Sequence, residues 1–356
     1  MMTSSDLRIL CISFFLLTIG CTIAPAASLR SPWGGVPIDP NAPTVDCAPA
    51  SPLPKVLVYN GYYTDAHHSV VDPEAKAAYE AASRANEVFV KRIGRYADEY
   101  QVGRSESAAE CAFSLLQQAA EQNAFGVAHL GKEGSRQGYY VQAFYLDGLS
   151  LAYLKIRPAL AGSARQRDQV QSWLLQLAES TRAFFDDMAR QNAGDGHNNL
   201  TYWGALAVTA TGIATNRQDL FDWGVAKYRA ALIEISADGT LPLELGRAAM
   251  ALHYHLFAVA PLVLIAELGR DNDLDLYAED NGALHRLVKQ TISGLLNPEW
   301  FTEKTHVAQE VPSELDGSVI GWAVPYEARF PNPAISSLLR KASSTGYWQL
   351  GGLPPK

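Results

Sequence analysis

The chain has 356 residues, of which 48% are hydrophobic and 19% are charged. This composition supplies enough apolar surface for a packed globular core and excludes an intrinsically disordered chain. The formal net charge of -8 at pH 7 argues against nucleic acid as a partner, because proteins that bind nucleic acid are usually basic. It neither favours nor excludes an acidic polymer, whose binding requires only a local cleft of suitable chemistry.

Residues 1–26 have the pattern of a secretory signal peptide. Arg8 precedes the apolar run 9–23, and the sequence 24–26 fits a small-x-small cleavage site. The run is too short to cross a bilayer comfortably, and no other uninterrupted apolar stretch of about 18 residues is present. We therefore predict a periplasmic protein without stable membrane insertion. The alternative is a lipoprotein anchored through Cys21.

Two cysteines remain after the predicted signal peptide, Cys47 and Cys111. An even pair in an oxidising compartment predicts a disulfide. The bond would tie an N-terminal arm to an early helix. Two unpaired thiols are the alternative.

Residues 27–71 are predicted to form an extended arm that wraps the body of the protein. The stretch 27–60 is rich in Pro, Ser and Ala and shows no helical period. The tyrosine-rich segment 60–69 that follows is polar and is predicted to be a mobile lid. Tyr62 or Tyr63 would then stack on a substrate.

From residue 72 onward, nearly every segment shows a hydrophobic period of 3.6 residues. Asp72-Pro73 predicts the start of the first helix, because proline is favoured at the first helical position. Further helices are expected near 105–123, 138–156, 163–191, 199–214, 217–235, 243–268 and 281–296. Strand signals are weak, and long helices with short connections favour antiparallel hairpins. We therefore predict one all-α domain over 72–335 and an irregular C-terminal tail over 336–356.

The segment 196–203 gathers polar and aromatic residues in front of an apolar helix. Asn198 or Asn199 can cap that helix, which would explain one of the two asparagines. The neighbouring aromatic residues exceed what a cap requires. We expect Tyr202 and Trp203 to bind substrate if the cluster is a functional site.

A second cluster lies within 243–255. Arg247 and Tyr254 are seven residues apart, about two helical turns, which places them on one face of a helix. An arginine beside a phenol favours the phenolate and lowers its pKa, so Tyr254 would become a usable general base. The commoner alternative is an arginine stem packed on a core tyrosine. His253 is expected to contact substrate, although it and His255 point away from that face by about 100° each.

A third polar segment, residues 134–140, leads into a helix. Arg136 and Gln137 carry forked guanidinium and amide donors, which suit sugar hydroxyls and carboxylates. We expect both to bind substrate. Tyr145 and Tyr153, further along this helix, are expected to be core residues.

The order of these motifs resembles the polysaccharide lyase family 5 alginate lyases. The resemblance covers roughly residues 30–330, and its motifs lie at 198–203, 216–223, 243–255, 281–287 and 322–326. It implies an incomplete (α/α) toroid with a long cleft, and a Cys47–Cys111 disulfide. It also implies endo-acting β-elimination of mannuronate-rich alginate or a related polyuronate, by a monomer without a metal or another cofactor.

The resemblance assigns the family's catalytic asparagine, arginine and tyrosine to Asn199, Arg247 and Tyr254. The family's catalytic histidine falls on Leu200. His197 lies three residues earlier and cannot take that position. Three interpretations follow: the enzyme works weakly without the histidine, another histidine substitutes, or the chain binds uronan without turnover.

Elimination at a uronate removes the C5 proton and expels the sugar linked through O4. The carboxylate makes that proton only weakly acidic, so Asn199 and Arg247 would offset its charge. In mannuronate, the proton and the leaving oxygen lie on one face, and Tyr254 would serve as both base and acid. A glycoside hydrolase would instead need two opposed carboxylates. Glu244 and Asp195 are available but do not form a convincing pair.

Overall fold

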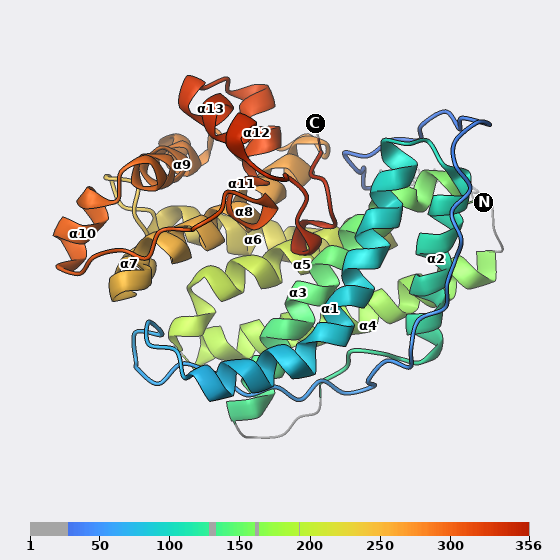
Figure 1. Ribbon diagram of the computed structural model, residues 1–356, viewed down its shortest axis with the longest axis horizontal. Helices are drawn as coiled ribbons and strands as arrows, with labels where there is room; N and C mark the ends of the chain where they lie inside the picture. Colours follow the sequence, from blue (N-terminus) through green and yellow to red (C-terminus); the bar gives the residue numbers. More distant parts are fainter. Residues whose placement is uncertain (1–27, 128–132, 161–163, 192, 356) are drawn as a thin grey trace, which may run out of the picture.

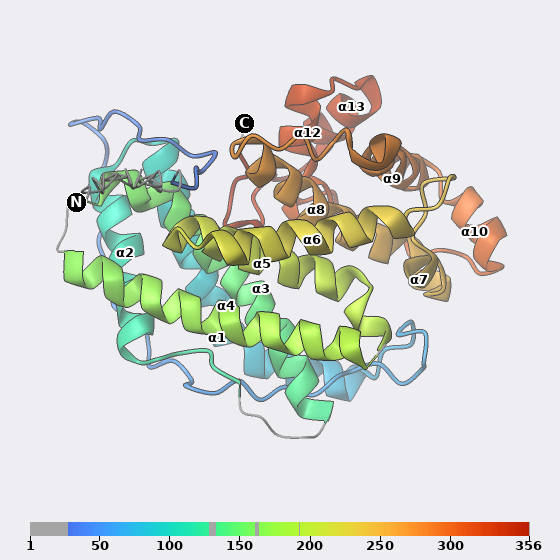
Figure 2. The same cartoon turned by 180° about the vertical axis from the view of Figure 1, so that it is seen from behind.

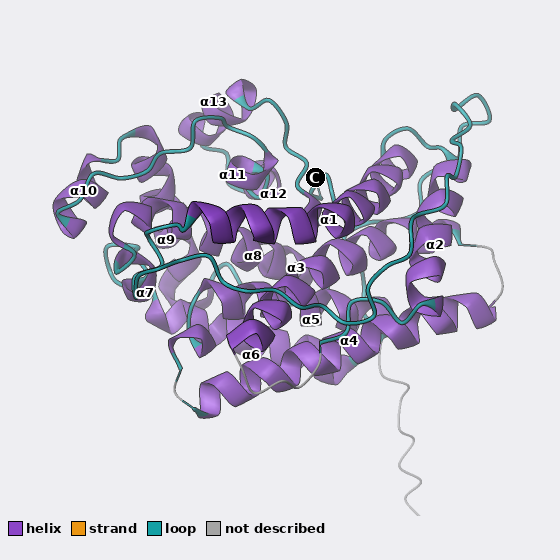
Figure 3. Ribbon diagram, turned by 60° about the horizontal axis from the view of Figure 1, so that its bottom comes forward, coloured by secondary structure: helices purple, strands orange, loops and turns teal. Residues whose placement is uncertain are grey.

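The computed structural model describes residues 28–127, 133–160, 164–191 and 193–355. The predicted signal peptide and the alternative lipid anchor at Cys21 lie outside these residues. The described part of the chain contains helices and loops, and its only β-structure consists of isolated bridges. Figure 3 shows the helices joined directly by loops. The all-α prediction is therefore confirmed.

The long helices pair as hairpins of consecutive elements. The pairs are α1 (Pro73–Gln101) with α2 (Glu106–Glu121), α3 (Glu133–Ile156) with α4 (Ala164–Arg190), α5 (Asn199–Thr215) with α6 (Gln218–Glu234), and α8 (Ala251–Arg270) with α9 (Glu279–Leu296). The hairpins follow one another around the molecule, from α1 and α2 in blue and green to α8 and α9 in orange (Figure 1).

The hairpins form two layers. In the inner layer α1 packs on α3, α3 on α5, and α5 on α8. The helices α5 and α8 are apolar and buried along almost their whole length, as expected for helices that are covered on all sides. Figure 2 shows α4 and α6 running across the outer face. This curved double layer is an incomplete (α/α) toroid, as predicted.

Short helices complete the fold. They are η1 (Arg157–Ala159), η2 (Gly194–Gly196), α7 (Pro242–Leu245), η3 (Ala248–Met250), α10 (Glu299–Thr305), α11 (Gly317–Ile320), α12 (Ala323–Arg329), α13 (Pro333–Lys341) and η4 (Trp348–Leu350). Among the described residues, the stretch Ala248–Arg270 is long and apolar enough to cross a membrane. Most of it is buried inside the protein, which also fits a core helix.

Two of the predicted helices are interrupted. The predicted helix 243–268 is broken between α7 and α8, where Ala248 has a left-handed φ of 49°. A left-handed residue cannot continue a right-handed helix. Likewise, Asp280, Asn281 and Gly282 have positive φ values in the first turn of α9, so its regular part begins after them.

The arm runs along the outside of the first hairpin (Figure 1). Cys47 and Cys111 form the predicted disulfide, with a Cα–Cα distance of 5.0 Å. Further along the arm, the backbone N–H of Ala50 donates to the side chain of Gln118 at 3.1 Å. The arm therefore lies against α2 through a covalent bond and through hydrogen bonds.

The C-terminal tail is docked on the body, whereas we expected it to be irregular. Residues 336–341 belong to α13. Beyond it, Lys155 donates from its buried ammonium group to the carbonyl oxygen of Gly351 at 2.7 Å. The N–H of Leu353 donates to Asp98 at 2.9 Å. These buried polar contacts hold the tail against α1 and α3, and sequence periodicity does not reveal contacts between residues so far apart.

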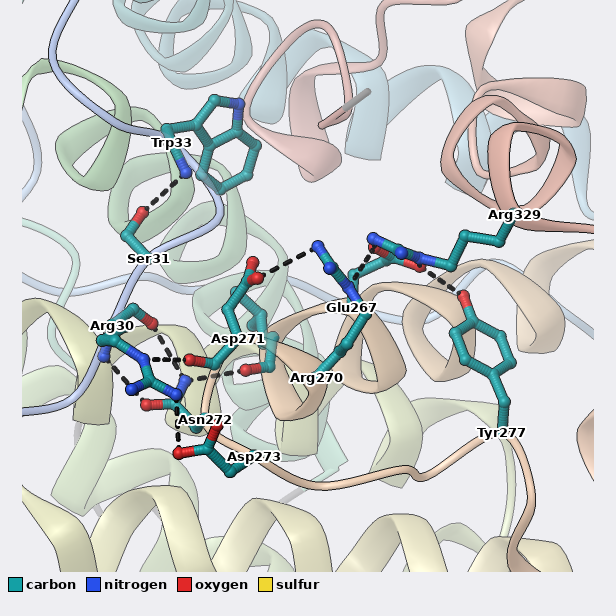
Figure 4. A network of polar contacts seen from close by, with 11 residues as sticks. Arg30, Ser31, Trp33, Glu267, Arg270, Asp271, Asn272, Asp273, Tyr277 and Arg329 are labelled. Carbon is teal, nitrogen blue, oxygen red and sulfur yellow. Dashed lines mark hydrogen bonds and ion pairs between the residues drawn. The ribbon is translucent and has the colours of Figure 1, made fainter.

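A polar network surrounds the C-terminal end of α8 (Figure 4). Glu267 is buried and accepts two hydrogen bonds from Arg329, each of 2.6 Å, and a third from Tyr277 at 2.8 Å. Close by, the backbone N–H of Arg30 donates to Asn272 at 2.8 Å. This network joins α8 to α12 and to the start of the arm.

Candidate active site

A cavity of about 270 Å³ opens at the N-terminal ends of α5 and α8. Its walls come from the arm, α1, α3, α5, the break between α7 and α8, α8 itself, α11 and the tail. The lining residues are Tyr62, Tyr63, His68, Tyr79, Gln137, Tyr140, Phe144, Asn199, Leu200, Arg247, His253, Tyr254, Leu256, Phe257, Pro312, Ser318, Val319 and Tyr347. The three predicted catalytic residues are among them.

The two adjacent asparagines have different tasks. Asn198 is the N-cap of α5, and its side chain accepts from the N–H of Leu200 at 3.0 Å. Asn199 is fully buried, and it donates to the carboxylate of Glu244 from its N–H at 2.8 Å and from Nδ2 at 2.9 Å. Its Oδ1 has no hydrogen-bond partner among the described residues. Helix capping therefore accounts for the asparagine side chain at position 198 but not for the one at position 199.

Glu244 is the buried centre of this group. Its side chain is inaccessible to solvent, and the Nε atom of Arg247 lies 3.5 Å from its Oε2. Burial raises the pKa of Glu244, whereas Arg247 and the hydrogen bonds from Asn199 counteract that rise. A buried carboxylate needs such partners. Glu244 thus fixes the positions of both residues from behind the cavity.

Arg247 lies over the ring of Tyr254. Its guanidinium carbon is 4.8 Å from the ring centroid, within the range of a cation–π contact. We expected the pair to share one face of a continuous helix, which is wrong, because Arg247 belongs to the break before α8. The predicted proximity is nevertheless correct.

The predicted low pKa of Tyr254 is also wrong. Burial raises its pKa to about 12, although a hydrogen bond from Tyr63 and the charge of Arg247 both lower it. The side chain is nearly inaccessible to solvent, and desolvation of the phenolate outweighs the two favourable contacts. Tyr254 is therefore a neutral phenol at pH 7.

The predicted lid segment lies directly over this pair. Tyr63 donates a hydrogen bond to the phenol oxygen of Tyr254, and the Tyr254 hydroxyl donates to the carbonyl oxygen of His68 at 3.4 Å. The rings of Tyr62 and Tyr63 are 4.8 Å apart. The arm thus supplies two tyrosines to the cavity, as expected.

Asp65 shapes this segment. Its carboxylate accepts from the backbone N–H groups of His67, Ser69 and Val70 at 2.7–3.1 Å. Desolvation raises the pKa of Asp65, but the hydrogen bonds together outweigh it and lower that pKa below its ordinary value. The His67 ring lies 2.8 Å from the carbonyl oxygen of Gly246, which joins the segment to the break that carries Arg247.

Leu200 lines the cavity at the position where the family resemblance implies a histidine. It packs against the buried cluster formed by Tyr140, Ala143 and Phe185. On the same side of the cavity, the rings of Phe144 and Phe257 meet edge to face at 5.8 Å. We call Leu200, Tyr140, Phe144 and Phe257 the apolar wall.

Of the histidines near the site, His253 is the one that α8 presents to the cavity. Its ring is parallel to that of Phe257 at 6.4 Å. The ring is open to the cavity but surrounded by protein, and this burial, followed by the charge of Lys76, lowers the pKa of His253. His253 is therefore neutral at pH 7 and able to carry a proton.

His68 of the arm also lines the cavity, whereas His255 and His197, the other two histidines considered from sequence, do not. His255 is fully buried, and its Nε2 accepts from the N–H of Leu241 at 3.0 Å. Burial lowers the pKa of His255 to about 4. His197 lies 3.5 Å from Glu234.

Three predicted substrate contacts do not line the cavity. Trp203 is fully buried, and its indole N–H donates to the carbonyl oxygen of Phe257 at 3.1 Å. Tyr202 is also buried, and its hydroxyl donates to Glu234 at 3.4 Å. Neither is available to a ligand, because α5 is covered on all sides at these positions. Arg136 is exposed outside the lining, whereas Gln137 lines the cavity and bonds to Tyr79.

Sequence analysis missed several lining residues. Tyr79 projects from the second turn of α1, Tyr140 from α3, and Tyr347 from the tail. Only Tyr347 had a usable signal, because the aromatic pair Tyr347-Trp348 is unusual in a segment expected to be irregular. The contacts that bring these residues together join distant parts of the chain.

The cavity lacks the arrangement that glycoside hydrolysis requires. Among the described lining residues there is no aspartate or glutamate, and Glu244 lies behind them. The side chain of Asp195, the other carboxylate that we considered, lies outside the described part of the chain. Two opposed carboxylates are therefore not found in this cavity.

A helical toroid whose cavity brings an asparagine, an arginine and a tyrosine together is the arrangement that the resemblance to polysaccharide lyases implies. A family model for alginate lyases matches residues 58–301, and the chain belongs to that family. Its fold and its class of enzyme, a polysaccharide lyase, therefore agree with the predictions made from sequence.

Relatives support this assignment over most of the chain. A polysaccharide lyase of Stenotrophomonas maltophilia is 34% identical, covering 82% of this chain and 84% of its own. Alginate lyases of Pseudomonas fluorescens and Azotobacter vinelandii are 30% and 27% identical, covering 91% and 99% of this chain and 89% and 94% of their own.

Solved structures show the same fold. Alginate lyase A1-III of Sphingomonas species A1 has a TM-score of 0.72 at 23% identity, with 87% of this chain and 86% of that chain covered. A variant of A1-III complexed with a tetrasaccharide has a TM-score of 0.76 at 23% identity, with 89% and 86% covered.

Proposed function

We propose that this alginate lyase cleaves mannuronate-rich alginate within the polymer, and that Asn199, Arg247 and Tyr254 carry the reaction. The observation behind the proposal is their convergence. Glu244 holds Asn199 and Arg247 together, and Arg247 lies 4.8 Å from the ring of Tyr254. These groups are nearly or fully buried, and electrostatic contacts are stronger there than in water.

Asn199 and Arg247 offset the charge of the uronate carboxylate. Elimination builds negative charge on this group as the C5 proton leaves, so fixed donors beside it lower the barrier. Arg247 has further guanidinium N–H groups beyond the Nε that faces Glu244. Because Glu244 and the Tyr254 ring fix its orientation, little reorganisation is needed when substrate binds.

Tyr254 transfers the proton. It removes hydrogen from C5, the C4–O4 bond breaks as C4=C5 forms, and the phenol returns a proton to the departing O4. The reactive form is the phenolate, which Tyr63 stabilises by donating a hydrogen bond. Arg247 stabilises the same form by its charge. The two contacts thus favour the base although burial opposes it.

Leu200 supports a second candidate function, a uronan-binding protein with little turnover. A leucine neither donates a hydrogen bond to the carboxylate nor carries a proton. His253, which lines the cavity in a neutral form, is the residue that would substitute for the missing histidine in the active enzyme.

We place the mature protein in the periplasm as a monomer that acts on alginate or a related polyuronate. The signal-peptide pattern of residues 1–26 and the Cys47–Cys111 disulfide support export, because disulfides persist in oxidising compartments. Detection of the protein in a periplasmic fraction, without fatty acid on Cys21, tests this assignment.

The test of the reaction uses the purified mature protein on polymannuronate, polyguluronate and polyglucuronate. Elimination creates an unsaturated uronate that absorbs ultraviolet light, whereas hydrolysis does not. We expect absorbance to rise fastest on polymannuronate. Binding of the polymers without any rise in absorbance would instead support the uronan-binding function.

A further inference from the structure

We infer that the cavity accepts a uronate that carries a small ester group, with the methyl end of that group against the apolar wall. This inference rests on the proposed function and specifies its substrate class. It arises from two observations: the chemistry of the wall beside Asn199, and the small positive charge of the cavity lining.

The charge of the lining is low for a site that receives a polyanion. Arg247 is the only lysine or arginine among the described residues that line the cavity. The carboxylate of Glu244 lies 3.5 Å from its Nε, so much of this positive charge is already offset. Because His253 has a lowered pKa, it adds no charge at pH 7. The cavity therefore suits a sugar with less exposed charge or more apolar surface than a bare uronate.

The apolar wall begins immediately beside the proposed carboxylate-binding residue. Leu200 follows Asn199 in the chain, and both line the cavity. Leu200 and Phe144 both pack against the cluster that contains Tyr140, and Phe144 meets Phe257 edge to face, so packing links the four residues of the wall. Sugar hydroxyls placed there would lose hydrogen bonds to water without replacement. A methyl group placed there gains by leaving water.

An ester group satisfies both observations. A methyl ester at C6 removes the carboxylate charge and makes the C5 proton more acidic, which reduces the need for a further charged donor. An acetyl ester on a ring hydroxyl keeps the charge but places its methyl group on the wall. In either case the reaction is the same elimination, with C5–H and C4–O4 broken, C4=C5 formed, the proton passed to O4 and the ester left intact.

The experiment compares four polymers at neutral pH with the purified mature protein. Three of them are polymannuronate, its partly O-acetylated form and its partly methyl-esterified form. The fourth comparison is each ester after mild removal of its ester groups. The initial rate of ultraviolet absorbance is measured against enzyme-free blanks. We expect kcat/KM about tenfold higher on one of the esterified polymers than on polymannuronate, the discrimination that one or two apolar groups provide. The advantage should disappear after de-esterification.

Three variants assign the preference to the wall. Leu200→Met keeps an apolar group and should keep the preference for ester, whereas Leu200→His should reverse it. Leu296→His, at an exposed leucine outside the lining, controls for an added histidine and should change nothing.

The outcomes separate the two proposals. Fastest cleavage of unmodified polymannuronate by the wild-type protein overturns the inference and leaves the proposed function intact. Equal effects of Leu200→Met and Leu200→His overturn the role of the wall. Absence of ultraviolet-absorbing product from every polymer overturns the proposed function, and the inference with it.

Discussion

Buried glutamates lie near both ends of α8: Glu244 in α7, before its N-terminal end, and Glu267 in its last turn. They differ in how fully the polar groups that contact them are hydrogen-bonded. Glu267, at the C-terminal end, accepts three hydrogen bonds from Arg329 and Tyr277 (Figure 4). Glu244, near the N-terminal end, binds Asn199 twice and forms an ion pair of 3.5 Å with Nε of Arg247, but Oδ1 of Asn199 has no hydrogen-bond partner among the described residues.

This difference separates a structural network from a reactive one. Buried polar groups are normally paired, so the unpaired Oδ1 of Asn199 beside the cavity can accept a hydrogen bond from a ligand. The network of Glu267 stabilises the junction of α8, α12 and the arm. The network of Glu244 holds Asn199 and Arg247 in position at the cavity, where we propose that substrate binds.

Substitution of the two tyrosines should have the largest and most contrasting effects. Tyr254→Phe removes the proposed proton carrier and should lower kcat by about 10²–10⁴-fold. Tyr277→Phe removes a hydrogen bond to Glu267 and should lower thermal stability while kcat stays within a factor of about two. Initial rates of absorbance on polymannuronate, with melting temperatures, test both. Similar kcat values for the two variants would contradict the assignment of Tyr254.

The glutamates themselves provide a matched comparison. Glu244→Gln removes the carboxylate that accepts from Asn199 and pairs with Arg247, so both side chains are held less firmly. If this weakens their stabilisation of the transition state by about 1–3 kcal/mol, kcat falls by roughly 5–150-fold. Glu267→Gln, equally buried, should lower the free energy of unfolding but not kcat of the folded protein. Because Glu244 touches no substrate, its variant should change kcat more than KM. An equal loss of kcat in both variants would contradict the assignment of a positioning role to Glu244 and a structural role to Glu267.

The pH dependence of the reaction rate should follow the ionisation of the Tyr254 phenol. Its pKa of about 12 lies above the working pH, so the phenolate fraction rises about tenfold for each pH unit. We expect log kcat/KM to increase with a slope near one between about pH 7 and pH 9. His253 adds no further bend there, because its pKa is lowered below its ordinary value. A rate that is flat or falls over this range would exclude Tyr254 as the base.

The disulfide should affect stability alone. Replacing Cys47 and Cys111 with alanine should lower the free energy of unfolding by about 2–4 kcal/mol, because the bond closes a loop of 64 residues along the chain. Neither cysteine lines the cavity, so kcat at 25 °C should not change. Denaturant titration measures the first quantity and the ultraviolet assay the second.

The sequence predicted the helices and the disulfide well, because periodicity and a single cysteine pair are local or unambiguous signals. It predicted that Arg247 and Tyr254 meet, although the helix that was to carry both is broken at Ala248. It did not predict the burial of Trp203 or the place of Tyr347 in the cavity. Both depend on packing between helices that are distant in the chain.

The same limit explains the prediction for the pKa of Tyr254. The charge of Arg247 is visible from sequence spacing and lowers that pKa. The desolvation that outweighs it comes from burial in the folded protein, where Tyr63 and His68 of the arm contact the Tyr254 hydroxyl. Only the three-dimensional structure places residues 62–68 over α8.

The central claim is that the elimination machinery is assembled around Leu200 and lacks only the histidine. The most direct test measures the ultraviolet rate on unmodified polymannuronate for Leu200→His, alone and combined with Tyr254→Phe. The account predicts a gain on the order of 10²-fold for Leu200→His, and loss of that gain when Tyr254→Phe is added. An unchanged or lower rate in a well-folded Leu200→His protein would contradict it, as would a gain that persists without the Tyr254 hydroxyl.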